Sequence, residues 1–307
     1  MSGSTVHGMA AMEYVAGQRC LLVPCTRPQK KSSERPIVIL GGMAQSILSW
    51  EGHVSFFSQS RDVVVYEARG QGPYAPHDTL RLQNVSLPAQ AMYLMKTLQE
   101  LNLVSSSSVD LVGFSLGGRI AMATSLLYPD RVHQLHLTGV AVDRSPMGHL
   151  TIASWKDHVQ NNDNLKSFAW SALLATYSPT TLKYWHDKPD QLKTTLDFVT
   201  KHNTREGLMA LLDQTHTHDD DDAANKNNEW SVASMASRIS PTIHGHACVG
   251  SLDHNMAPVT QVEKLCHILK WKSPTILEGA GHAVPMEQPR AWRKDVMDFL
   301  NFLNQNH

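Results

Sequence analysis

The chain has 307 residues, of which 42% are hydrophobic and 18% charged, so it can bury a sizeable core as one large domain or two modest ones. Its 27 Lys and Arg residues nearly balance 28 Asp and Glu residues, for a formal net charge of −1. Without a basic stripe, this balance argues against nucleic acid as a partner. No apolar run reaches the roughly 20 residues that a membrane span needs. The N-terminus lacks the pattern of a secretory signal, and the four cysteines are widely spaced, so we expect a cytoplasmic protein with reduced thiols.

Short β-branched runs alternate along the chain with longer segments of helical periodicity. This alternation predicts right-handed βαβ units, and therefore an α/β fold in which helices flank both faces of a mostly parallel sheet. The predicted strands are Arg19–Pro24, Ile37–Leu40, Asp62–Tyr66, Val109–Gly113, Val132–Thr138, Thr242–Val249 and Pro274–Leu277. The predicted helices are Ser86–Leu103, Leu116–Tyr128, Pro258–Leu269 and Glu287–Asn304.

The alternation breaks once, over residues 145–240, where helix-like stretches occur without a convincing strand. We expect this segment to form a helical cap on a core made of residues 1–144 and 241–307. A cap at the carboxyl edge of the sheet lies where α/β folds bind ligands. Its aromatic residues either line a pocket, with Trp170 as a candidate for binding substrate, or pack the interior of the cap. The polar segment His216–Glu229 lacks the spacing and the glycine of a calcium loop, and we interpret it as a solvated loop.

The most specific motif is Gly113-Phe114-Ser115-Leu116-Gly117-Gly118, which directly follows a predicted strand and opens a predicted helix. In this context G-x-S-x-G forms a sharp turn that lifts the serine hydroxyl above the sheet. Glycines flank the serine because side chains there would collide with the adjacent strand and helix. The motif predicts Ser115 as a nucleophile, and the N–H of Leu116 at the start of the helix as an oxyanion donor.

A serine hydroxyl needs a base that is held in place by an acid. The chain has 17 histidines, and position favours His282, which follows the last predicted strand and therefore reaches the same sheet edge as Ser115. Asp253 follows the preceding strand, and the chain order Ser115, Asp253, His282 matches one class of catalytic triad. Asp143, which follows the strand before the cap, is the alternative acid.

A second oxyanion donor is expected in the loop Gly41–Ala44, directly after a predicted strand. Glycines in this loop let the backbone approach the reacting carbon closely. We predict that the N–H of Met43 pairs with the N–H of Leu116, and the alternative is a plain strand-to-helix turn. Such a mechanism requires neither a metal nor an organic cofactor.

Several segments resemble the α/β-hydrolase-fold superfamily, namely ILGGMA, VVVYEARGQGPY, LVGFSLGGRIAMATSLLYPDRV, VGSLDHNMAP and EGAGHAVPMEQP. They span about residues 35–145 and 240–305 and leave the cap unmatched. The chain departs from the family at two places: it has Gly41–Gly42 where the family usually has His-Gly, and Glu67 where the family usually has Asp. Neither position supplies a residue of the triad. The resemblance implies a nucleophile at Ser115. A serine there argues against the haloalkane dehalogenases and epoxide hydrolases, which attack with a carboxylate.

The run Ser-Leu-Gly-Gly-Arg, which ends at Arg119, is similar to the menaquinone-pathway lyases that eliminate pyruvate with the same triad. In those enzymes the arginine helps to hold a substrate carboxylate, which suits its bidentate guanidinium group. The other basic residues that these lyases place after the pre-cap strand have no counterpart in AVDRSPMGHL. Arg119 is a candidate substrate-binding residue, and its alternative is an exposed position on its helix. Phe114, next to the serine, is a second candidate.

These residues predict a serine hydrolase that cleaves a carboxylic ester or thioester of a small or medium, fairly apolar acid through an acyl-enzyme. Its partner is a small-molecule substrate. Two alternatives stay open. One is a carbon–carbon lyase or hydrolase with the same triad, and the other is a non-catalytic ligand receptor built on the same fold.

Overall fold

The computed structural model describes residues 11–15, 17–27, 34–73, 84–104, 107–161, 164–215 and 228–302. Within these residues, eight strands form one sheet in the order β1-β2-β4-β3-β5-β6-β7-β8. Strand β2 is antiparallel to β1 and to β4, and each of the other neighbouring pairs is parallel. The strands are β1 (Ala11–Val15), β2 (Gln18–Val23), β3 (Ile37–Leu40), β4 (Val63–Tyr66), β5 (Val109–Phe114), β6 (Val132–Thr138), β7 (His244–Gly250) and β8 (Thr275–Leu277).

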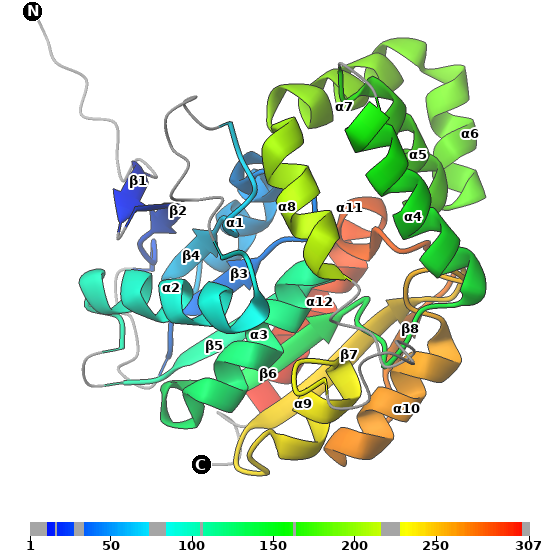
Figure 1. Ribbon diagram of the computed structural model, residues 1–307. Coiled ribbons are helices and arrows are strands. Elements are labelled where there is room, and N and C mark those ends of the chain that lie inside the picture. The colour runs from blue at the N-terminus through cyan, green and yellow to red at the C-terminus, as the bar shows by residue number, and fades with distance from the viewer. Residues whose placement is uncertain are drawn as a thin grey trace, which may run out of the picture.

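Helices cover both faces of the sheet, and an inserted group stands over one end of it (Figure 1). The elements around the sheet are η1 (Ile47–Trp50), α1 (Glu51–Phe57), α2 (Leu87–Glu100), α3 (Leu116–Leu127), η3 (Pro129–Arg131), α9 (Val232–Arg238), α10 (Val259–Leu269), α11 (Val284–Glu287) and α12 (Pro289–Phe302), where η marks a 3₁₀ helix. The inserted helices are α4 (Pro146–Asn161), α5 (Lys166–Thr176), α6 (Pro179–Asp187), α7 (Pro189–Lys201) and α8 (Arg205–Thr215).

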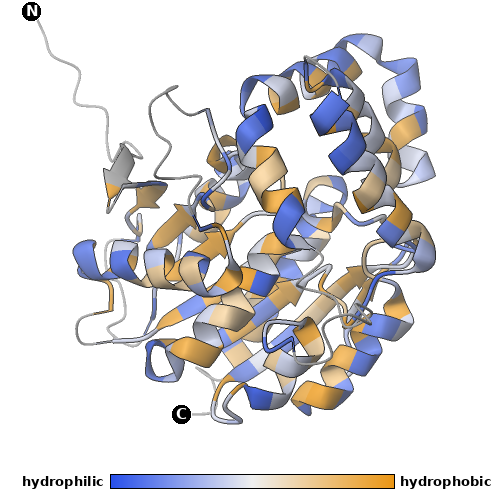
Figure 2. Cartoon of the chain, viewed as in Figure 1, coloured by the Kyte–Doolittle hydropathy of each residue, from blue (hydrophilic) through white to orange (hydrophobic). Residues whose placement is uncertain are grey.

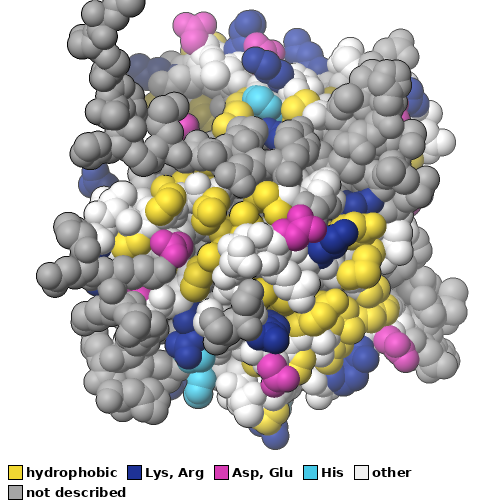
Figure 3. All heavy atoms as spheres, turned by 90° about the vertical axis from the view of Figure 1, so that its left-hand side faces the viewer, with side chains coloured by type: hydrophobic (Ala, Val, Ile, Leu, Met, Phe, Trp, Pro, Cys, Tyr) yellow, Lys and Arg dark blue, Asp and Glu magenta, His cyan; other side chains and the backbone are white. Residues whose placement is uncertain are grey.

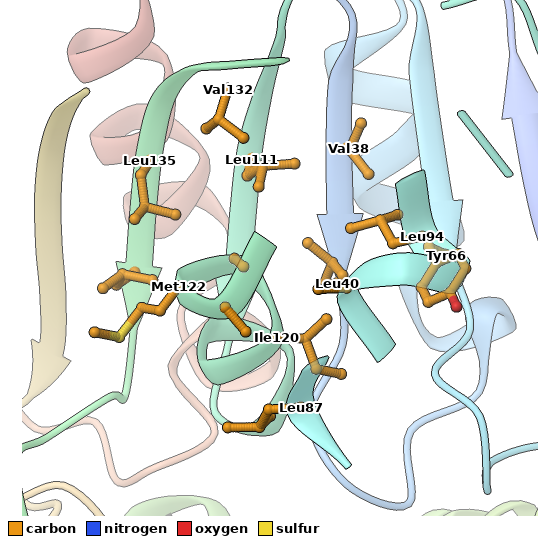
Figure 4. Packing of buried hydrophobic residues seen from close by; sticks show 14 of the residues in the cluster. Val38, Leu40, Tyr66, Leu87, Leu94, Leu111, Ile120, Met122, Val132 and Leu135 are labelled. Atoms are coloured by element: carbon orange, nitrogen blue, oxygen red, sulfur yellow. The ribbon is translucent and has the colours of Figure 1, made fainter. Parts of the chain in front are cut away.

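Strands β3 and β4 are continuous apolar runs because helices bury them on both faces. Every residue of β3 and β4 is buried. On one face, Ile120 and Met122 of α3 pack with Leu40 and Leu111 of the sheet (Figure 4). On the other face, α1 and α12 pack against the sheet around Trp292. The strands accordingly form an apolar centre, whereas the outer faces of the inserted helices are hydrophilic (Figure 2).

The helical insertion is narrower than residues 145–240, the range expected from the sequence. Helix α9 falls inside that range, yet its Val232, Met235 and Ala236 join the core cluster formed with α2 and α3. This helix therefore belongs to the layer that covers the sheet, and the cap helices run from α4 to α8. Most of the polar segment His216–Glu229 lies outside the described residues.

The surface near β1, β2 and α2 carries both signs of charge. Among the described residues of this face, Lys and Arg side chains are interspersed with Asp, Glu and hydrophobic ones (Figure 3). This distribution is typical of a chain with a formal net charge of −1. None of the helices in the described part of the chain is long and apolar enough to cross a membrane.

The carboxyl ends of the parallel strands meet at one edge of the sheet, below the inserted helices. The turns after β5 and β7 and the loop after β8 all leave the sheet there, together with the loop after β3. This edge is where α/β folds place their ligands. The fold therefore brings the segments that contain Ser115, Asp253, His282 and Met43 to one place.

Candidate active site

Ser115 occupies the turn between β5 and α3 in a strained backbone conformation. Its φ is 53° and its ψ is −117°, a combination that non-glycine residues rarely adopt. The turn is held by hydrogen bonds, since the N–H of Ser115 donates to the carbonyl of Thr138, and Gly118 and Arg119 donate to the carbonyl of Ser115. The half-buried serine side chain is thereby fixed above the sheet edge, in the form of a nucleophile elbow.

Two glycines beside the serine are required by close packing. A Cβ atom on Gly113 would lie 2.5 Å from the Cα of Gly118, and one on Gly117 would lie 2.1 Å from the carbonyl oxygen of Leu40. Both contacts involve backbone, which cannot move aside. The sharp turn therefore depends on glycine on both sides of Ser115.

His282 links the serine to a buried acid. Its Nε2 lies 3.0 Å from Oγ of Ser115, and its Nδ1 lies 2.5 Å from Oδ2 of Asp253. The ring packs against Phe114, with 5.2 Å between the ring centroids. Gly139 makes room for it, because a Cβ atom there, at a φ of 61°, would lie 3.0 Å from Cε1 of His282. Motif analysis missed Gly139, which lies outside the matched glycine patterns.

Asp253 is set up to stay ionised. Burial raises its pKa, but the charge of His282, its hydrogen bond and two backbone N–H donors outweigh burial and hold the pKa below its usual value. The two donors are the N–H groups of Met256 and Ala257, which both bond to Oδ1. An ionised Asp253 accepts from Nδ1–H of His282, which leaves the Nε2 lone pair free for the proton of Ser115.

The alternative acid, Asp143, has a different imidazole partner. Its Oδ1 lies 3.0 Å from Nε2 of His149 on α4, and the same oxygen accepts from the N–H of Arg144. The structure therefore brings Asp253 to His282, and Asp143 to a histidine of the cap.

The loop after β3 lies beside the serine. The N–H of Gly42 donates to Oε1 of Gln45 at 2.8 Å, so that donor is occupied, and the next N–H along the chain is that of Met43. Ala44 follows with a φ of 63°, and its carbonyl accepts from Nδ2 of Asn203 between α7 and α8. Sequence reasoning missed Asn203, since only the fold brings it to this loop.

The N–H of Leu116 belongs to the first turn of α3, whose donors have no acceptor within the helix. The positive end of the helix macrodipole lies at the same point. An oxyanion beside Ser115 would therefore meet backbone donors from two segments, the start of α3 and the loop after β3.

A cavity of about 370 Å³ opens between the cap and the sheet edge, with Ser115 and His282 in its wall. Among the lining residues that the structure describes, none is Asp, Glu, Lys or Arg. Most of the lining comes from the cap helices and from the loop after β3. The large apolar side chains are those of Met43, Leu48, Phe114, Trp155, Phe168, Leu173, Phe198, Val199, Met256 and Met286.

Two of the candidate substrate-binding residues lie elsewhere. Trp170 is 38% exposed and does not line the cavity. Phe168 of the same helix does, and at 100° per residue Trp170 lies about 200° around α5 from it, on the side away from this cavity. Arg119 is buried on α3 and is also absent from the cavity wall. Its position differs from both alternatives, a substrate contact and an exposed site.

Glu287 ties the histidine loop to the cap. Its Oε1 accepts from the N–H of Gly281, and its Oε2 accepts from the N–H of Ser178 and from Oγ1 of Thr181 at the start of α6. The two partners in the cap, Ser178 and Thr181, are 109 and 106 residues away from Glu287 in sequence. No sequence signal identified Glu287, because its role depends on this long-range contact.

The chain matches a family model described as the alpha/beta hydrolase family over residues 37–294. A curated relative, the putative 2-succinyl-6-hydroxy-2,4-cyclohexadiene-1-carboxylate synthase of Bacillus subtilis, is 24% identical over 280 residues. That alignment covers 88% of this chain and 91% of the relative. It agrees with the similarity carried by the run that ends at Arg119.

Solved structures share the fold. An alpha/beta hydrolase enzyme from a Medee basin deep-sea metagenome library has a TM-score of 0.73 at 19% identity, over 93% of this chain and 95% of that one. The enol-lactonase of Burkholderia xenovorans has a TM-score of 0.71 at 18% identity, over 94% and 99%. The meta-cleavage product hydrolase of Pseudomonas fluorescens has a TM-score of 0.70 at 15% identity, over 96% and 97%. These likenesses confirm the predicted architecture.

Proposed function

Since the chain belongs to the alpha/beta hydrolase family, we propose that it is a serine hydrolase that cleaves a carboxylic ester or thioester. The acyl chain of the substrate is fairly apolar and carries no charge. One observation carries the proposal. A continuous chain of hydrogen bonds runs from Ser115 through His282 to Asp253, and it begins in the wall of an apolar cavity.

In the proposed mechanism, Oγ of Ser115 attacks the carbonyl carbon while Nε2 of His282 takes its proton. Asp253 orients the imidazole and stabilises its charged form. The N–H groups of Met43 and Leu116 hold the oxyanion. His282 then returns the proton to the leaving alcohol or thiol, which leaves an acyl-enzyme. Water, activated by the same imidazole, releases the acid and restores the serine.

The composition of the cavity wall supports an uncharged substrate. Its described lining residues include no Lys or Arg, so a substrate carboxylate would lose its hydration there without gaining an ionic partner. Burial of an unpaired charge is strongly unfavourable. A volume of about 370 Å³ suits a small or medium acyl group.

The main alternative is the carbon–carbon lyase, which the Bacillus relative favours at 24% identity. That relative is named for a product that carries a carboxylate. In this chain the corresponding arginine, Arg119, does not line the cavity, which favours the hydrolase over the lyase. A receptor with the same fold would bind ligand without turnover.

We predict that a panel of p-nitrophenyl esters separates these alternatives. Neutral acyl chains should be hydrolysed with kcat/KM at least about 10-fold above matched chains that end in a carboxylate, since one unmet charged hydrogen bond costs about 1.5–3 kcal/mol. No pyruvate should form from the substrate of the menaquinone-pathway lyases. Tight ligand binding without turnover would support the receptor instead.

Arg119→Met provides the matched variant, since methionine keeps much of the buried stem. We expect it to change neutral-ester kcat/KM by less than about threefold, because the guanidinium does not line the cavity. Robust pyruvate release by wild type that collapses in Arg119→Met would contradict the hydrolase proposal and support the lyase.

A further inference from the structure

A second group of polar side chains lies on the face of the sheet that α12 covers, apart from the triad. It consists of His136 on β6, His246 on β7 and Asp295 on α12. Nε2 of His136 is 2.9 Å from Oδ2 of Asp295, and Nε2 of His246 is 3.1 Å from Oδ1 of the same carboxylate. The three groups can offer one ligand atom each, and these atoms all lie within 4.8 Å of one another.

Two imidazoles and a carboxylate form a donor set that suits zinc and related transition-metal ions. Bonds of about 2.0–2.1 Å in tetrahedral geometry place neighbouring ligand atoms roughly 3.3 Å apart. The separations of 2.9 and 3.1 Å join the two imidazoles to different oxygens of Asp295, and one ligand atom from each residue lies within 4.8 Å of the others, so side-chain rotations would bring one oxygen and both nitrogens to this spacing. We propose that His136, His246 and Asp295 bind a divalent transition-metal ion, for which Zn²⁺ is the probe.

The surroundings of His136 support this role. Coordination through Nε2 requires the ring proton on Nδ1, and Oγ1 of Thr138 lies 3.5 Å from that nitrogen as a possible acceptor. This hydroxyl is itself fixed by the Nε1–H of Trp292, at 2.8 Å. Metal-bound histidines commonly have such an outer partner, which sets the tautomer and the ring orientation.

The group also has access to solvent. His246, Thr275 and Asp295 line a second cavity of about 700 Å³, whereas His136 lies behind them and is fully buried. The cavity provides an entry path for the ion and room for a water molecule at the fourth coordination position. Without a metal, Asp295 would simply accept hydrogen bonds from the two histidines. Zinc binding is the property that distinguishes a metal site from such a hydrogen-bonded cluster.

The test is a titration of tag-free protein, stripped with a chelator, against Zn²⁺ in competition with a chromogenic chelator. Wild type should take up about one equivalent. His246→Ala and Asp295→Asn should each weaken binding at least about 100-fold, because loss of an outer partner alone costs 10–100-fold. His244→Ala, on the same strand and in the wall of the same cavity, is the matched control and should stay within about threefold.

His282→Ala should also retain the affinity, which distinguishes this site from the triad. Absence of competitive zinc binding, or binding that is lost in His282→Ala and kept in His246→Ala, would overturn the proposal. X-ray absorption by zinc-loaded wild type gives an answer that does not depend on how the variants fold. We expect a first shell at about 2.0–2.1 Å with two imidazoles, and a shell of oxygen alone would contradict the proposal.

Discussion

Asp253 and Asp143 both follow strands that end at the same edge of the sheet, and each carboxylate contacts one imidazole. Asp253 lies 2.5 Å from His282, and Asp143 lies 3.0 Å from His149. Chain position alone leaves both acids as candidates. They differ in the direction of the side chain, which the turn after β7 sets through the two N–H donors to Asp253.

We predict that Asp253→Asn lowers kcat by about 10⁴ and leaves the fold intact, because the amide favours the wrong tautomer of His282. An amide oxygen can still accept from Met256 and Ala257, which preserves the turn. The matched Asp143→Asn should change kcat by less than about threefold. Steady-state kinetics on a neutral ester, with circular dichroism as the folding control, checks both. A severe loss in Asp143→Asn with a mild one in Asp253→Asn would reverse the assignment.

Two long-range contacts join the cap helices to the loops that contain His282 and Met43. Glu287 connects the histidine loop to the start of α6, and Asn203 connects the loop after β3 to the end of α7. The cap therefore covers the cavity and also helps to position the loops that contain His282 and Met43.

We predict that Glu287→Gln lowers kcat by about 10–100-fold while KM changes little, since a hydrogen bond to a charged group is worth about 1.5–3 kcal/mol. The amide nitrogen of glutamine cannot accept from Ser178 and Thr181. Glu278→Gln, an exposed position on the same loop, is the control and should behave as wild type. A lower melting temperature with unchanged kcat would show that Glu287 stabilises the fold without positioning His282.

Apolar runs and hydrophobic periodicity in the sequence predicted the strands that are buried on both faces and the helices that are strongly amphipathic. The bounds of β3 and β6 agree with the sequence, and the nucleophile turn falls between a strand and a helix as expected. Among the strands and α-helices outside residues 145–240, those without a prediction are β1, α1 and α11, of which α11 has four residues and α1 has seven. Such short segments carry too few periods to stand out. The lining of the cavity depends on how α5 is rotated, and the sequence alone does not reveal which side of this helix Trp170 occupies.

The pH dependence of stability is a property of the whole molecule, and His53 contributes to it. This residue of α1 packs edge-on against Trp292 of α12, with 4.8 Å between the ring centroids. Burial, helped by the charge of Arg293, lowers its pKa from 6.5 to about 4, against a backbone hydrogen bond to Pro285. Between these pH values the unfolded chain takes up a proton that the folded chain does not.

The free energy of unfolding should therefore fall as the pH falls from about 6.5 to about 4, by about 3 kcal/mol from this group. Urea unfolding at pH 7 and at pH 4.5 measures the effect. In His53→Gln, which does not titrate, the loss between the two pH values should be smaller by about 2–3 kcal/mol. Equal losses in wild type and variant would contradict the role of His53.

Fluorophosphonate labelling with peptide mass spectrometry tests the nucleophile most directly. Wild type should be modified stoichiometrically at Ser115 and lose esterase activity in step, because this hydroxyl is 3.0 Å from Nε2 of His282. Ser49 lines the same cavity, so Ser49→Ala should label as wild type does, while Ser115→Ala should not label. Stoichiometric modification of Ser49 or another serine, or a folded wild type whose Ser115 does not react, would contradict the proposed mechanism.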